Sequence, residues 1–345
     1  MRALVLSKYG PPANLSIKET EAPRLQHKSA QMLVRMHSAG LNAADTMIRS
    51  GQASLLSKDP FPAGICGMDF CGTVEEVGER VNGIRVGDIV YGQKSTCGSQ
   101  AEYCIVDQAN DQVVKKPDSV SREFASTIAC AGLTALNALA DKAKLEPGQR
   151  LLVLGGTGGV GGFGVQIGRI LKASEVVTVC SGANEEYAKE LGATSTIDYR
   201  TQDVKQVLQQ RTGEPFDVVF DCVGGQEYFD ATSHCLRRGG VFVTAVGASP
   251  FYRLQEKASF WGILRMMGIA MRQNMFGKTW YSIAGNAGQP GLERLNEWAA
   301  SGQLLPLRMR KFPFSQAAAA HAAQDTGHTV GKNVIVVDEG EIEPL

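Results

Sequence analysis

A glycine-rich loop, Gly156-Thr157-Gly158-Gly159-Val160-Gly161, constrains this chain more than any other feature of its sequence. The loop follows an apolar run at 151–154 that is typical of a buried strand, and it opens a stretch at 160–171 with helical composition. In that context G-x-G-x-x-G predicts a dinucleotide-binding loop. The first glycine permits the tight turn, the second lets a pyrophosphate approach the backbone, and the third packs the helix on the strand. A purely structural glycine-rich loop is the less favoured alternative.

Strands and helices alternate through the middle of the chain. Apolar runs at 176–180, 217–222 and 240–246 are typical of strands, and residues 185–191 are typical of a helix. Strands that alternate with helices predict a parallel, doubly wound α/β sheet.

The two ends of the chain have a different pattern of apolar residues. Residues 1–120 contain short apolar runs between glycines, which predict a compact antiparallel unit. The runs lie at 74–77, 88–91 and 101–106, and they are followed by helical composition at 124–144. In the tail we expect helices at 291–301 and 314–323, and a last strand at 333–337.

Composition excludes several classes of protein. The 345 residues are 43% hydrophobic and 20% charged, which is ordinary for a globular chain of one large or two smaller domains. Lys plus Arg (35) equals Asp plus Glu (35), so no basic excess indicates nucleic acid as the main partner. No transmembrane segment is predicted, because the longest uncharged run, 151–168, is too rich in glycine. Eight cysteines without a C-x-x-C pair and a start without a targeting leader favour a cytoplasmic protein, or a mitochondrial one if its N-terminus has been trimmed.

The end of the second strand of the α/β region, Thr178-Val179-Cys180-Ser181-Gly182, bears on the choice of dinucleotide. A site for NAD places an Asp or Glu about 20 residues beyond the glycines, where it accepts hydrogen bonds from the ribose hydroxyls. That carboxylate is missing here, which leaves room for the 2′-phosphate of NADPH. The candidate donors to this phosphate are Ser181, Asn184 and Tyr199, with Lys189 or Arg200 as cations. Alternatively, Ser181 only caps the next helix.

Further motifs resemble those of a known family. They are Gly40-Leu41-Asn42-Ala43-Ala44-Asp45, Ile48-Arg49-Ser50-Gly51, Gly67-Met68-Asp69-Phe70-Cys71-Gly72-Thr73-Val74, Gly87-Asp88-Ile89-Val90, Gly132-Leu133-Thr134-Ala135, Asp221-Cys222-Val223-Gly224 and Gly331-Lys332-Asn333-Val334. With the glycine loop they resemble the medium-chain dehydrogenases/reductases over nearly the whole chain, and most of all the quinone oxidoreductase, or zeta-crystallin-like, group. Residues 251–281 and the ending after them are more similar to the branch that includes the mitochondrial NOGO-interacting oxidoreductase.

This resemblance implies a fold and a domain division. The fold would be α/β, with a GroES-like β-rich catalytic domain and a Rossmann doubly wound nucleotide-binding domain. Residues 1–124 and 288–345 would form the first domain, because the last strand would return to the N-terminal sheet, and residues 125–287 would form the second. The implied NADPH-binding residues are Thr134, Thr157, Gly158, Gly159, Val160, Ser181, Asn184, Tyr199, Cys222, Val223, Val246, Gly247 and Lys332. A homodimer is expected from the habit of the family.

Zinc is not expected. The zinc alcohol dehydrogenases of this family carry catalytic ligands where this chain has Asn42, Met68 and Cys130, and one thiol cannot replace the roughly three protein ligands of a catalytic zinc. The four closely spaced cysteines of the structural zinc lobe are absent as well. The histidines show no metal or triad spacing, and we expect His321, in an alanine-rich stretch, to be partly exposed.

Without a metal to polarise an alcohol, the favoured substrate is an acceptor that is already electron-poor. A quinone or an activated alkene can take a hydride from nicotinamide with the help of positioned hydrogen-bond donors alone. Asn42 is the candidate donor, and Asp45 and Thr134 are candidates for holding the loop or the nicotinamide ribose. An Asx turn after Gly40 is the alternative for Asn42 and Asp45.

These observations favour a zinc-independent NADPH:quinone oxidoreductase. A 2-alkenal or enoyl reductase is one alternative, although it needs a proton donor that the sequence does not show clearly. A non-catalytic, NADPH-binding regulatory or structural protein is the other.

Overall fold

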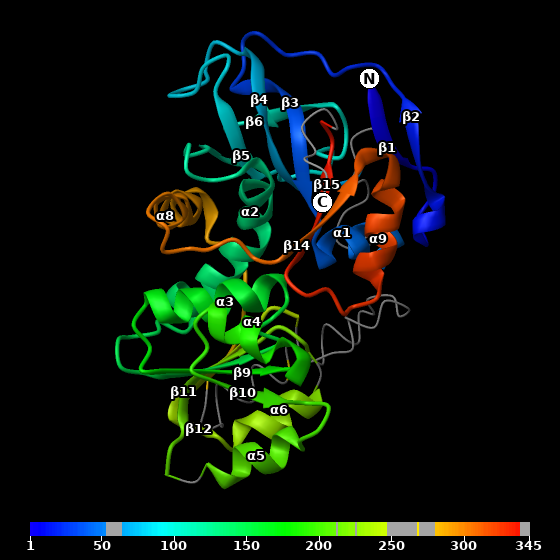
Figure 1. The fold of residues 1–345 in the computed structure, drawn as a ribbon. Coiled ribbons are helices and arrows are strands. Elements are labelled where there is room, and N and C mark those ends of the chain that lie inside the picture. The colour runs from blue at the N-terminus through cyan, green and yellow to red at the C-terminus, as the bar shows by residue number, and fades with distance from the viewer. Residues whose placement is uncertain (53–63, 212, 225, 247–267, 269–279, 339–345) are drawn as a thin grey trace. The chain divides into compact units, whose positions relative to one another are not determined.

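A computed structural model describes residues 1–52, 64–211, 213–224, 226–246, 268 and 280–338 (Figure 1). The chain forms two compact units. The β-rich unit comprises Met1–Ala131, Gly288–Gly302 and Pro306–Leu345, and the α/β unit comprises Gly132–Ala287 and Gln303–Leu305. The division falls inside helix α2 (Arg122–Leu136), whose first part is bonded to the β-rich unit: the Cys130 N–H donates to the Asp69 Oδ1.

A seven-stranded sheet forms the centre of the β-rich unit. Its strand order is β14-β15-β3-β4-β5-β7, with β6 also pairing with β3, and only the β14–β15 pair is parallel. The strands are β3 (Gln31–Gly40), β4 (Asp69–Val77), β5 (Ile89–Gln93), β6 (Tyr103–Asp107), β7 (Gln112–Lys115), β14 (Met309–Pro313) and β15 (Lys332–Val336). β1 (Arg2–Leu6) and β2 (Leu15–Glu19) form a separate antiparallel pair. The expected antiparallel unit and the return of the last strand to the N-terminal sheet are both present.

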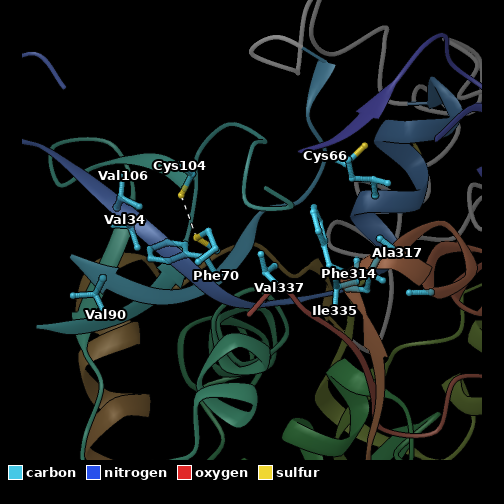
Figure 2. Close-up of a cluster of buried hydrophobic side chains, with 14 of the residues drawn as sticks. Val34, Cys66, Phe70, Val90, Cys104, Val106, Phe314, Ala317, Ile335 and Val337 are labelled. Carbon is cyan, nitrogen blue, oxygen red and sulfur yellow. Dashed lines mark hydrogen bonds between the residues drawn. The ribbon is translucent and has the colours of Figure 1, made fainter. Parts of the chain in front are cut away.

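The core of this unit follows the two-residue period of its strands. In β3, Met32, Val34 and Met36 are buried in alternation with half-buried neighbours. They join a cluster that includes Phe70, Phe314 and Ile335, and Figure 2 shows several of these side chains between the sheet and the elements that cover it. Asp69 directly precedes Phe70, so a fully buried core side chain adjoins a polar residue of the site described below.

Helix α9 (Ala317–Asp325) corrects one expectation. It packs against β15 and against α1 (Ala43–Ser50), and it buries Ala317, Ala320 and His321, which lie three and four residues apart on one face. His321 is 0% exposed rather than partly exposed, and its Nε2 lies 2.9 Å from the Gln100 Oε1. Burial lowers the pKa of His321 to about 3. The small alanines let the helix approach closely, which carries the neighbouring histidine into the interior.

The α/β unit contains a six-stranded sheet in the order β10-β9-β8-β11-β12-β13, and all of its strand pairs are parallel. The strands are β8 (Arg150–Leu154), β9 (Glu175–Cys180), β10 (Ser195–Asp198), β11 (Phe216–Asp221), β12 (Leu236–Thr244) and β13 (Trp280–Ile283). Helices α3 (Gly159–Ile170) and α4 (Glu185–Glu190) lie on one face, and α5 (Val204–Gln210) and α6 (Gln226–Ser233) on the other (Figure 1). The predicted doubly wound sheet is confirmed.

The other α-helices of the described residues are α8 (Gly288–Ala300) and α2, which continues as a π-helical turn, Asn137–Lys142. Among the described helices, the stretch Arg122–Lys142 is long and apolar enough to cross a membrane by composition, but 78% of its most apolar part is buried inside the protein. Such burial is typical of a core helix.

Candidate active site

Asn42 begins helix α1 directly after strand β3. Its backbone is extended (φ −127°, ψ 159°), and its N–H donates to the Asp45 Oδ2 at 2.8 Å, while the Asp45 N–H donates to the Asn42 carbonyl at 3.1 Å. These two bonds satisfy the start of the helix. Gly40 allows the approach of α2 at this point, because a Cβ on Gly40 would lie 2.2 Å from the Ser126 carbonyl oxygen.

The Asn42 side chain lies between two charged groups. Its Nδ2 donates to the Asp69 Oδ2 at 2.9 Å, and its Oδ1 accepts from the Lys332 Nζ at 2.6 Å. Lys332 also donates to the Leu41 carbonyl at 2.8 Å, and its Nζ lies 3.9 Å from the Asp69 Oδ2. Asn42, Asp69 and Lys332 are 7%, 0% and 3% exposed. Besides these two charged partners, Asn42 also forms a capping box with Asp45 at the start of α1.

The topology of the sheet brings these residues together. Strands β4 and β15 flank β3 and run antiparallel to it, so the end of β3 lies beside the beginnings of both. Asp69 is the first residue of β4 and Lys332 is the first residue of β15. The α2 backbone adds a fourth segment, because the Cys130 N–H donates to the Asp69 Oδ1 at 3.0 Å.

Two carboxyl groups share one ammonium in this buried site. Burial, together with the nearby charge of Asp69, raises the pKa of Asp45 to about 7. Burial also raises the pKa of Asp69, to about 6, against the opposing effects of Lys332 and of the hydrogen bonds from Asn42 and Cys130. The Asp45 Oδ1 is buried and has no hydrogen-bond partner. Near neutral pH the site thus holds an ionised Asp69 beside Lys332, with Asp45 the group that takes up a proton first.

The three positions that correspond to catalytic zinc ligands show no metal-binding set. Asn42 is bonded as described, Met68 supplies only a half-buried thioether, and burial raises the pKa of the Cys130 thiol. Within the part of the chain that the structure describes, no group of three or more His, Cys, Asp or Glu side chains could hold a metal ion. All eight cysteines are thiols, six of them buried.

The glycine loop of the α/β unit fits a dinucleotide phosphate. Gly155 has a left-handed φ of +77°, so the tight turn lies one residue before the motif. A Cβ on Gly156 would lie 2.0 Å from the Thr178 Oγ1, and one on Gly161 would lie 2.2 Å from the Gly155 carbonyl oxygen. Gly158 is the N-cap of the 12-residue helix α3. The loop therefore presents backbone N–H groups at a helix N-terminus, which is the arrangement that binds a pyrophosphate.

The other expected cofactor residues follow the same edge of the sheet. Thr157 to Val160 follow β8, Ser181 and Asn184 follow β9, Tyr199 follows β10, Cys222 and Val223 follow β11, and Val246 follows β12. Because the strands are parallel and adjacent, their carboxyl ends meet at one edge, on both sides of the point where the strand order reverses. Thr134 lies on α2, also in the α/β unit, and Gly247 lies outside the described residues.

Lys332 is the one expected cofactor residue among those described that comes from the other unit. It belongs to the β-rich unit, where its ammonium is bonded to Asn42.

A carboxylate that the sequence analysis did not consider lies at the edge of the α/β sheet. Asp198 ends β10, directly across from Cys180 at the end of β9, and a Cβ on Gly182 would lie 2.6 Å from its Oδ2. Hydrogen bonds from the Arg200 backbone and the Thr201 hydroxyl lower the pKa of Asp198. The parallel pairing of the two strands is the signal that could have found it, since Asp198 closes the strand next to the missing carboxylate.

The residues expected to bind the 2′-phosphate differ in how far their side chains are already bonded within the protein. Lys189 is engaged with Glu185 at 2.8 Å and with Glu186 at 3.4 Å. The Ser181 hydroxyl accepts from the Asn184 Nδ2 at 3.0 Å and keeps its own O–H to donate, and Tyr199 is 42% exposed.

Comparison with known proteins follows this geometry. Residues 28–118 match the alcohol dehydrogenase GroES-like domain, and residues 191–335 match the zinc-binding dehydrogenase domain. The 2-methylene-furan-3-one reductase of Solanum lycopersicum is 30% identical over 97% of this chain and 79% of its own length. The mitochondrial NAD(P)H oxidoreductase RTN4IP1 of Homo sapiens is 28% identical over 98% of this chain and 89% of its own. This chain is a medium-chain dehydrogenase/reductase.

Solved structures of the family agree. The quinone oxidoreductase from Coxiella burnetii superimposes with a TM-score of 0.80 at 28% identity, covering 98% of this chain and 99% of its own. The expected family and the expected fold, a GroES-like domain with a Rossmann domain, are confirmed, and the chain falls with the quinone oxidoreductase group. As a medium-chain dehydrogenase/reductase it is an oxidoreductase of an NAD(P)H-dependent family.

Proposed function

We propose that this protein is a zinc-independent reductase that transfers a hydride from NADPH to a quinone. The observation that carries the proposal is the Asn42 side chain, which stands with Asp69 and Lys332 where metal-dependent relatives hold zinc. An amide cannot activate an alcohol for oxidation as a metal ion does. It can donate a hydrogen bond to an oxygen that gains negative charge, which is what the reduction of a quinone requires.

The roles of the residues follow from their bonds. An amide nitrogen carries two hydrogens, and Asp69 accepts one of them. The Asp45 carboxyl is a further side-chain partner of Asn42, and we propose that the acceptor oxygen takes the second N–H in its place. Asp45 fixes the start of α1 and therefore the backbone of Asn42. When bound at the glycine loop, NADPH supplies the hydride, and we assign Thr134 to the orientation of its nicotinamide ribose.

The preference for NADPH rests on Ser181, Asn184 and Tyr199 as donors to the 2′-phosphate. The carboxylate of Asp198 opposes this preference through its charge. Three backbone or hydroxyl donors, from Gly182, Arg200 and Thr201, stabilise that charge locally. We therefore propose that NADPH is preferred, but by a modest factor.

A reductase of activated alkenes is the second candidate. Two relatives favour it by name, the tomato furanone reductase and the chloroplastic NADPH-dependent alkenal/one oxidoreductase of Arabidopsis thaliana, which is 28% identical over 97% of this chain and 79% of its own length. The alkene carbon would also need a proton, and Asp45, whose pKa burial raises to about 7, is the group at the site that holds one most readily at neutral pH. Its bonds hold it within α1, so quinone reduction, which needs no proton on carbon, remains our first proposal.

A single assay separates the candidates. NADPH oxidation is measured with 1,2-naphthoquinone, with trans-2-alkenals and with no acceptor, before and after treatment with a chelator. We expect turnover with the quinone, unchanged by the chelator. Turnover with alkenals alone would establish the second candidate, no turnover with NADPH still bound would indicate a non-catalytic protein, and loss of activity on zinc removal would refute zinc independence. We also propose a homodimer, which light scattering would detect as twice the mass of 36.9 kDa.

A further inference from the structure

The side-chain amide of Asn42 is held in one orientation by opposite charges. Its oxygen faces the Lys332 ammonium at 2.6 Å, and its nitrogen faces the Asp69 carboxylate at 2.9 Å. A flipped amide would place an N–H against the ammonium and a carbonyl against the carboxylate, so both contacts would become repulsive. In a site that is 0–7% exposed, water weakens neither contact.

We propose that Asp69 and Lys332 are positioning residues of the reductase, which lock the Asn42 amide so that its remaining N–H is fixed and strengthened as a donor. This inference rests on the proposed function, in which that N–H stabilises the acceptor oxygen. The ammonium on Oδ1 withdraws electron density from the amide, and hydrogen bonds to charged groups are about twice as strong as neutral ones. In this proposal Lys332 acts through Asn42.

Stability alone does not account for this arrangement. Burying a carboxylate and an ammonium carries a desolvation penalty that their attraction often fails to offset, and apolar replacements of buried ion pairs are often neutral or stabilising. Here the penalty is increased by a second carboxyl group, Asp45, within the same buried site. We therefore attribute the buried pair of Asp69 and Lys332 to the orientation of the Asn42 amide rather than to stability.

Replacing Asp69 by Asn tests the lock with little change in size. The two carboxylate oxygens accept separately, Oδ1 from the Cys130 N–H and Oδ2 from the Asn42 Nδ2. An asparagine has only one oxygen, so its NH₂ would face one of these donors and the amide of Asn42 would lose its partner. Lys332→Met removes the other side of the lock and keeps most of the side-chain volume.

Asp111→Asn is the matched control. Asp111 is also a buried carboxylate of the β-rich unit, it uses both oxygens to accept hydrogen bonds from Ser95 and Asp107, and it lies 3.6 Å from the Nζ of Lys94. It shares no bond with Asn42. Loss of a buried, lysine-paired carboxylate should therefore lower the melting temperature in both variants, whereas only Asp69→Asn should affect the amide of Asn42.

The first measurement needs no acceptor. In protein labelled with ¹⁵N-asparagine, with the Asn42 resonance assigned by its loss in Asn42→Ala, we expect exchange of the Asn42 side-chain amide with water to accelerate at least about tenfold in Asp69→Asn and Lys332→Met. Asp111→Asn should leave it unchanged. Equal exchange in wild type and in both site variants would overturn the lock, and it would do so even if the protein reduced no quinone.

The second measurement asks whether Asp69 acts through Asn42. With the best acceptor from the assay above, Asp69→Asn should lower kcat about tenfold with little change in KM, but less than about twofold in an Asn42→Ala background. Equal losses in the two backgrounds would show that Asp69 acts independently of Asn42. If wild type reduces no acceptor, the proposed function fails, and the amide exchange still decides the positioning.

The pH profile gives a third readout. Protonation of Asp69, whose pKa burial raises to about 6, should release the lock, so kcat of the wild type should fall below about pH 6. The other titratable groups that face Asp69 are Asp45 on α1, Lys332 on β15 and the Cys130 thiol on α2. Burial raises the pKa of Asp45 to about 7, so Asp45 is the group to be told apart from Asp69. The fall should persist in Asp45→Asn and disappear in Asp69→Asn. A fall that disappears in Asp45→Asn instead would overturn the assignment to Asp69.

Discussion

The candidate sites at the edges of the two sheets are built from different groups: side chains in the β-rich unit and backbone N–H groups in the α/β unit. At the first, buried side chains from three strand ends and a helix meet around Asn42, and the charges of Asp69 and Lys332 define the geometry. At the second, the glycine loop contributes backbone N–H groups and excludes side chains by close contact, as at Gly156 and Gly161. A site built from side chains should respond to pH and to isosteric changes, while a site built from backbone should respond to any added atom.

The largest expected effect is on the free energy of unfolding, and it tests the group of buried charged side chains around Asn42. Burial raises the pKa of Asp45 from 3.8 to about 7, so the folded state binds a proton that the unfolded state has released. This contribution to the free energy of unfolding is fully present below about pH 4, and it is lost as the pH rises to 7. Over this range the loss amounts to about 4 kcal/mol by linkage.

Asp45→Asn cannot ionise and keeps an acceptor oxygen for the Asn42 N–H. In urea unfolding at several pH values, the free energy of unfolding of the variant should therefore increase relative to that of the wild type between pH 4 and 8. Parallel pH profiles of the two proteins would contradict the predicted shift.

Gly156→Ala tests the backbone edge. The added methyl group would lie 2.0 Å from the Thr178 Oγ1, which itself accepts from the Gly156 N–H and donates to the Val153 carbonyl. Because the loop must move, we expect the affinity for NADPH to fall by about 100-fold, or about 2.7 kcal/mol. Fluorescence titration measures it. Gly148→Ala is the control, since Gly148 has a positive φ of +86° but open space around it, and it should retain NADPH affinity.

Asn42→Ala removes the proposed donor itself. We expect kcat/KM for quinone to fall by about 10- to 100-fold, the size of one or two lost hydrogen bonds. Steady-state kinetics check this, with Asn82→Ala, an exposed asparagine in the same unit, as the control. An unchanged rate would leave Asn42 only its role at the start of α1.

The smallest effect concerns the choice between NADPH and NADH, which we attribute to side chains beside the glycine loop rather than to its backbone. The ratio of kcat/KM for NADPH over NADH should be about tenfold, since one hydrogen bond to a charged phosphate contributes roughly that factor. Ser181→Asp should reverse much of it, and Asp198→Asn should increase it by about threefold by removing a half-buried negative charge. Parity between the cofactors in the wild type would refute the NADPH preference.

The glycine loop could be predicted from the sequence more completely than the side chains around Asn42. The glycine loop and its flanking strands are contiguous, so a local pattern predicts both the fold and the phosphate site. Asn42 was found as a candidate, but its partners lie 27 and 290 residues away, and only the order of β15, β3 and β4 brings them together. Asp198 was missed because it belongs to the neighbouring strand, and His321 was misplaced because burial of a helix face depends on what packs against it.

The position of Lys332 also has a consequence for biosynthesis. During translation, Asn42 and Asp69 are synthesised long before β15, the strand that pairs with β3 on the side away from β4. Until residue 332 emerges, the ammonium that compensates the two acidic side chains is missing. The α/β unit, whose sheet closes within a contiguous stretch, can fold meanwhile. Synthesis of β15 is thus the step that brings Lys332 to Asn42 and Asp69, and a ribosome stalled before it carries an α/β unit without the complete set of side chains around Asn42.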